Sequence, residues 1–132
     1  MTRLSSLVYD ATLILTSFAF GVGTLCHRRD FGWRLAVYAA VVSILFRTYR
    51  LSLVARRVIG EEEELRSHPL FVHDMTVACV TLATGTCFAE TRVSACLAAS
   101  LLCFASAWHK DLATNRLRHV AGHLCAVLAA WQ

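Results

Sequence analysis

The sequence has little of what builds flexible or irregular chains: one proline, six glycines and no low-complexity run among its 132 residues. Collagen-like, linker-like and disordered proteins are therefore excluded. Charged residues are also scarce, at 17%, against about 25% in an ordinary soluble domain. Hydrophobic residues reach 57%, against the usual value of about 45–50%. The length allows a single domain, residues 1–132, and the composition favours a protein that lives in a membrane.

Several signatures of small functional domains are missing as well. The six cysteines contain no C-x-x-C pair, which excludes a thioredoxin-type redox motif and a zinc ribbon. Most of them fall inside apolar runs, so we expect buried thiols that act as small hydrophobic residues. No A-x-A cleavage site follows the first apolar stretch, which we interpret as a retained helix rather than a signal peptide. No basic stripe lies on a polar helix face, so no nucleic-acid partner is expected.

Five apolar runs follow one another along the chain and predict an all-α, polytopic transmembrane helical bundle. The runs cover residues 7–26, 31–50, 69–89, 93–108 and 117–131. At about 1.5 Å per residue the first run reaches about 30 Å, the thickness of the hydrocarbon core of a bilayer. The last two runs are shorter, and we expect the arginines at their ends to extend toward the membrane surface. A soluble bundle would need a polar stripe on every helix, and residues 93–108 offer only three serines.

Basic residues are divided unequally between the two ends of this predicted bundle. Nine arginines and lysines fall at the end that holds the N-terminus, and four fall at the other end. By the positive-inside rule, the N-terminus faces the cytoplasm or an organellar matrix. The loop between the second and third runs carries Glu61–Glu64 among arginines, and we expect it to form a short amphipathic surface helix. Asp10 and Arg34 lie near the ends of runs, where snorkelling would carry their charges to water.

Histidines gather at the same predicted end of the bundle. The candidate metal ligands are His73, His109, His119 and His123. His119 and His123 are four residues apart, which places them on one face of a helix. Imidazoles that meet at one membrane surface can bind zinc, or haem between two helices. Histidines in this position can also simply hydrogen-bond to headgroups, water and neighbouring carbonyls, in which case no cofactor is needed.

The sequence leaves three functional hypotheses open. The chain has little mass outside the predicted spans and no catalytic motif. We therefore expect a non-catalytic accessory subunit that packs against other membrane subunits and lipids in a larger complex, such as a respiratory or ATP-synthase assembly of the mitochondrial inner membrane. The alternative is a histidine-dependent zinc or haem membrane protein, with enzymatic activity included. A channel or transporter, the third hypothesis, would need polar residues at mid-membrane depth, and the sequence points to none.

Overall fold

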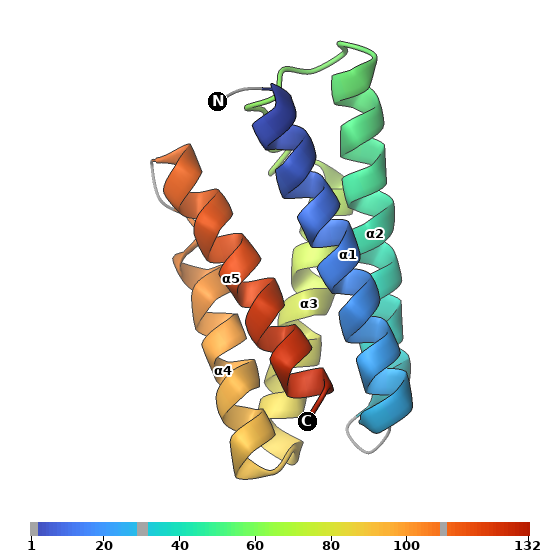
Figure 1. Ribbon diagram of the computed structural model, residues 1–132, viewed down its shortest axis with the longest axis vertical. Helices are drawn as coiled ribbons and strands as arrows, with labels where there is room; N and C mark the ends of the chain where they lie inside the picture. Colours follow the sequence, from blue (N-terminus) through green and yellow to red (C-terminus); the bar gives the residue numbers. More distant parts are fainter. Residues whose placement is uncertain (1–2, 29–31, 109–110) are drawn as a thin grey trace.

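The computed structural model describes residues 3–28, 32–108 and 111–132, and these residues form five α-helices, as the all-α prediction requires. The helices are α1 (Arg3–His27), α2 (Trp33–Ala55), α3 (Pro69–Phe88), α4 (Thr91–Ser106) and α5 (Leu112–Ala130). Successive helices run in opposite directions, so the two termini lie at opposite ends of the bundle (Figure 1). These ends are called the N-terminal end and the C-terminal end below.

The helices form a ring that follows the order of the chain. Each helix packs against its neighbour in sequence, and α5 packs against α1. Figure 1 shows α1 and α5 side by side, with α3 behind them. Every helix therefore turns one face toward the centre of the bundle and another toward its surroundings.

Local sequence explains where α3 and α5 begin. Pro69 occupies the first turn of α3, where the missing N–H has no helical partner to lose. Nδ1 of His68 accepts a hydrogen bond from the backbone N–H of Leu70 at 3.1 Å. Asp111 caps α5 in the same way, because its carboxylate accepts from the backbone N–H and the hydroxyl of Thr114 at 3.2 and 2.6 Å. Both side chains satisfy helix donors that would otherwise lack partners.

The apolar core lies in the half of the bundle nearer the C-terminal end. It consists of Phe20, Ala36, Ala40, Leu82, Val93, Leu97, Phe104, Ala126, Ala129 and Ala130. Small residues let the helices approach closely around it. A Cβ atom added at Gly21 of α1 would lie 3.1 Å from Cβ of Ala40 on α2. The hydroxyl of Ser100 on α4 donates to the carbonyl of Gly122 on α5 at 2.6 Å. Such contacts are the means by which helices associate when the solvent is lipid.

Three helices are long and apolar enough to cross a membrane: α1 from Ser6 onward, α2 and α3. Helix α4 is apolar but has 16 residues, and α5 carries two arginines and two histidines among its 19 residues, which lower its hydropathy. Large apolar side chains on the outer faces are exposed over more than 60% of their surface. They include Leu15, Phe18, Leu45, Leu102, Leu117 and Leu128. The outside of the bundle is therefore apolar on α4 and α5 as well.

The surface helix expected between α2 and α3 does not form. Residues 56–68 lie in turns and irregular structure. Arg57 and Leu65 have φ angles of 58° and 56°, which lie outside the right-handed helical region. The carbonyl groups of Glu61 and Glu63 accept hydrogen bonds from buried arginine side chains, not from helical N–H groups. The charge pattern predicted an amphipathic helix, but contacts with the bundle determine the conformation.

Candidate functional site

A cluster of charged side chains is buried at the N-terminal end, under the loop of residues 56–68. Asp10 of α1 is fully buried, and its carboxylate pairs with two arginines of α2. Nη1 of Arg47 lies 3.3 Å from Oδ1 of Asp10, and Nη1 of Arg50 contacts Oδ2. The two arginine side chains are 1% and 0% exposed. The prediction that Asp10 snorkels to water is therefore wrong, because its partners lie inside the bundle.

The loop contributes backbone carbonyls and one carboxylate to this cluster. Nη2 of Arg50 and Nη2 of Arg116 each donate to the carbonyl of Glu61 at 2.6 Å. Nε of Arg50 donates to the carbonyl of Glu63 at 3.0 Å. Nε of Arg116, on α5, forms an ion pair with Oε1 of Glu64 at 2.8 Å. The charged cluster thus joins α1, α2, α5 and the loop.

Tyr9 connects the charged cluster to the histidines of α5. The guanidinium carbons of Arg47 and Arg116 lie 5.3 and 4.7 Å from the centre of the Tyr9 ring, within the range of a cation–π interaction. The hydroxyl of Tyr9 forms a hydrogen bond with Nδ1 of His119 at 2.9 Å. Buried polar contacts therefore continue from the N-terminal end toward the middle of the bundle.

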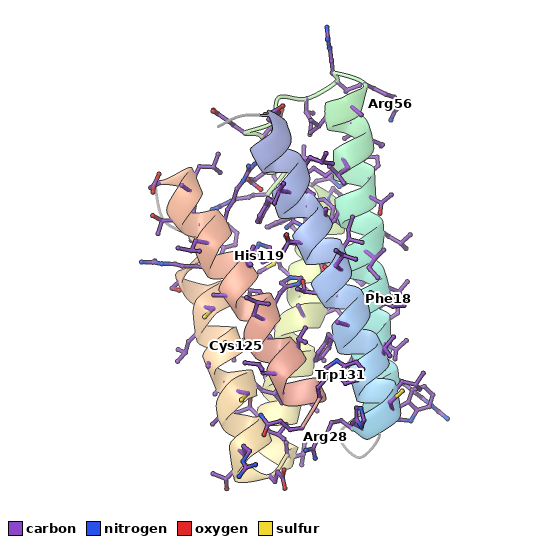
Figure 2. The ribbon with its side chains drawn as sticks, in the orientation of Figure 1. Phe18, Arg28, Arg56, His119, Cys125 and Trp131 are labelled. Carbon is purple, nitrogen blue, oxygen red and sulfur yellow. The ribbon has the colours of Figure 1, made fainter. Side chains whose placement is uncertain are left out.

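His119 and His123 lie one turn apart on the inner side of α5, and their ring centres are 5.1 Å apart. Figure 2 shows His119 between α5 and α1. Nδ1 of His123 forms a hydrogen bond with the hydroxyl of Thr16 on α1 at 2.9 Å. Ser17, also on α1, donates to the hydroxyl of Ser43 on α2 at 3.0 Å. Polar groups from three helices thus meet near the middle of the bundle, where the sequence pointed to none.

These polar groups line a central cavity to which all five helices contribute. The cavity has a volume of about 50 Å³, and a water molecule needs roughly 10–15 Å³ by this measure. Most of the wall is apolar, but the buried side chain of Asp74 on α3 also lines it. The central cavity can therefore hold a few water molecules, or one small ligand, beside two imidazole rings.

The structure brings together two of the four predicted metal ligands. His73 lies on the exposed side of α3, where its Nε2 is 2.7 Å from the hydroxyl of Tyr38. His109 lies outside the described residues. Among the residues that are described, no three or more His, Cys, Asp or Glu side chains are arranged to hold a metal ion. The candidate ligand set therefore reduces to His119 and His123.

The cysteines do not extend this site. All six are free thiols. Cys26 and Cys87 are exposed, and the other four are partly buried. The expectation of buried thiols is therefore wrong for Cys26 and Cys87, whereas Cys96 packs against the apolar core.

The charged cluster is the part of the site that the sequence prediction missed. Asp10 and Arg47 are 37 positions apart, and the prediction that Asp10 snorkels gave it no partner. The predicted topology did place Asp10, Arg47 and Arg50 at the same end of the bundle, and that shared depth is the signal that could have paired them.

Scans of the chain against protein-family models, curated proteins and solved structures found no match. The candidate site therefore consists of the two features described above, a buried ion-pair cluster and an imidazole pair beside a small cavity.

Proposed function

We propose that the chain is an integral membrane protein in which all five helices cross the bilayer, with the N-terminal end on the cytoplasmic or matrix side. The support for including α4 and α5 is their outer surface. Leu102, Leu117 and Leu128 are 71%, 70% and 61% exposed, and contiguous apolar surface of this kind favours lipid or another protein over water. The excess of basic residues at the N-terminal end supports the orientation.

Orientation can be tested in sealed vesicles with single cysteines placed in a cysteine-free chain. A cysteine at Arg57 reports on the N-terminal end, and one at Thr91 reports on the C-terminal end. Both residues are exposed: Arg57 lies in the loop between α2 and α3, and Thr91 is the first residue of α4. We expect a membrane-impermeant maleimide to label only one of the two from outside the vesicle, namely the cysteine at Thr91 if the vesicles keep the native orientation. Equal labelling of both would contradict a spanning bundle.

Within the membrane, we propose that the protein is a non-catalytic accessory subunit that packs against the helices of other membrane subunits. The observation that carries this proposal is the combination of a closed ring and an apolar exterior. The five helices already cover one another's inner faces, yet every outer face still presents large apolar side chains. A respiratory or ATP-synthase assembly of the mitochondrial inner membrane is one complex of this kind.

The polar groups of the interior support a structural role for the same chain. The carboxylate of Asp10 pairs α1 with two arginines of α2, and Arg116 of α5 donates to the carbonyl of Glu61, which Arg50 also contacts. The histidines bond to side chains of α1. Several interior polar groups thus hold helices together, and intramembrane polar contacts are a recognised means of doing so.

The proposal can be tested by photo-crosslinking in native membranes. A photoreactive amino acid at Phe18 on α1 or at Leu102 on α4 would sit on outward surfaces that are 63% and 71% exposed. The same amino acid at Arg56, in the exposed loop, is the control. We expect at least one helix position to give a crosslink to a discrete polypeptide. After mild detergent extraction without crosslinking, the protein should comigrate with that polypeptide. The proposal of an accessory subunit would be refuted if the protein migrates as a free monomer and both helix positions crosslink to lipid alone.

The histidine pair favours a second candidate, a zinc or haem membrane protein. Nδ1 of each ring bonds to a hydroxyl of α1, which leaves Nε2 of each ring as the nitrogen for a metal. We would then expect stoichiometric zinc or a Soret band in purified protein, lost in a His119→Ala/His123→Ala variant and kept in His73→Ala. This candidate would be excluded if the purified protein retains neither zinc nor haem and the double variant keeps the function of the unmodified chain.

A further inference from the structure

A second, smaller cavity lies at the N-terminal end, between the charged cluster and the aromatic residues around Trp108. Its volume is about 20 Å³, room for roughly one ligand atom of the size of water oxygen. Three arginines line it, Arg47, Arg66 and Arg116, together with a single acidic residue, Glu64. We call it the arginine cavity.

Arg47 has donor capacity that no side chain of the bundle uses. Its Nη1 faces Asp10 at 3.3 Å, but its Nε and Nη2 are buried and have no hydrogen-bond partner among the described residues. The side chain is 1% exposed, so water around the protein does not satisfy these groups either. A buried, unpaired N–H group of a charged side chain is costly, and an anion in the adjoining arginine cavity would relieve that cost.

Among the described residues, Arg66 is the arginine at this cavity that has no carboxylate partner. Asp10 is shared by Arg47 and Arg50, and Glu64 is paired with Arg116. Arg66 donates to the carbonyl of Ala107 at 3.3 Å and lies over the ring of Trp108 at 4.4 Å, and neither contact neutralises it. The buried carboxylate of Asp74 on α3 also acts on Arg47, so Arg66 is the cation at this cavity that an anion would neutralise.

We propose that the arginine cavity binds a phosphate group, with one oxygen inserted beside Arg47 and the others held at the mouth by Arg66. Guanidinium groups match the geometry of phosphate oxygens and bind them with charge-assisted hydrogen bonds. Trp108 is 55% exposed, so the cavity wall reaches the surface at the end of the bundle. Basic pockets between membrane helices bind phospholipid headgroups at this depth, and a free phosphate ion offers the same oxygens.

The test uses the full-length protein in micelles of dodecyl maltoside, a detergent that carries no phosphate group. Phosphatidylglycerol, inorganic phosphate and chloride are the three probes, and lipid retention by native mass spectrometry and the melting temperature are the readouts. Arg66→Gln removes one proposed donor without touching a carboxylate. Arg56→Gln removes an equal charge from the same loop, where Nε of the side chain donates to the carbonyl of Ser52. Arg47→Lys keeps the charge beside Asp10 but removes the unpartnered nitrogens.

We expect one tightly retained phosphatidylglycerol per protein, or stabilisation by inorganic phosphate above that by chloride. The first result identifies a lipid as the source of the phosphate group, and the second identifies a free ion. Arg66→Gln and Arg47→Lys should bind about tenfold more weakly, which corresponds to the loss of one charge-assisted hydrogen bond, whereas Arg56→Gln should bind as the unmodified chain does. Equal effects of phosphate and chloride without lipid retention, or equal losses in Arg66→Gln and Arg56→Gln, would overturn the phosphate site. Circular dichroism verifies that each variant is folded.

Discussion

The substitution Asp10→Asn should be among the most destabilising that a single atom exchange can produce in this chain. It preserves the shape of the side chain but removes the only carboxylate that contacts Arg47 and Arg50 among the described residues. Both guanidinium groups would remain buried, at 1% and 0% exposure, with their charges uncompensated. Breaking a buried ion pair by removing one partner costs about 3–5 kcal/mol, or roughly two to four powers of ten in the folded-to-unfolded ratio.

The matched control is Glu90→Gln, which breaks an ion pair near the surface. Nη2 of Arg28 lies 3.3 Å from Oε1 of Glu90, whose side chain is 62% exposed, and such exposed pairs contribute about 0–1 kcal/mol. The assay is reversible unfolding in mixed micelles of a mild detergent and sodium dodecyl sulfate, followed by far-UV circular dichroism. Adding Arg47→Gln to Asp10→Asn should restore part of the lost stability, because one uncompensated charge is removed. If Asp10→Asn and Glu90→Gln lower the free energy of unfolding by the same small amount, the buried charges do not stabilise the protein as argued above.

Three further predictions concern packing and hydrogen bonds, each measured as a change in unfolding free energy in the same micelles. Gly122→Ala should cost about 1–3 kcal/mol, because the new Cβ would lie 2.6 Å from the ring of Phe104. In the control, Gly60→Ala, the new Cβ meets nothing within 4 Å, and stability should change by less than about 0.5 kcal/mol. Ser100→Ala removes a buried interhelical hydrogen bond of 2.6 Å and should cost about 0.6–1.7 kcal/mol. Trp131→Phe removes a bond of 2.9 Å to a carbonyl of α1 at an exposed position, so its loss should be smaller than that of Ser100→Ala. The reverse order for either pair would contradict the packing described here.

The helices were predictable because their apolar runs are long and are separated by polar or charged residues. The ends of the helices were less predictable. Helix α2 continues to Ala55, five residues past the predicted membrane span of residues 31–50, and Arg47 and Arg50 find partners inside the bundle. Helix α5 begins at Leu112, because Asp111 caps it, whereas the prediction began the span where the sequence becomes apolar. Hydropathy locates the membrane-compatible part of a helix, while capping determines where the helix starts.

The site was predictable only where its members share a helix. A spacing of four residues placed His119 and His123 together, and their rings do lie one turn apart. The position of His73 depended on the rotation of α3 about its axis, which a helix that is apolar on all sides does not reveal. The pairing of Asp10 with Arg47 depended on how α1 faces α2, and the prediction that Asp10 snorkels did not consider a partner on another helix.

The pairing of Asp10 with two arginines of the next helix bears on how such a chain would enter a bilayer. All three charges belong to the first helical hairpin, α1 and α2, which a ribosome completes before the remaining helices exist. The hairpin can therefore leave the translocon with its acid already neutralised. The contribution of Arg116 arrives last, with α5, when the newest helix docks against the oldest and closes the ring.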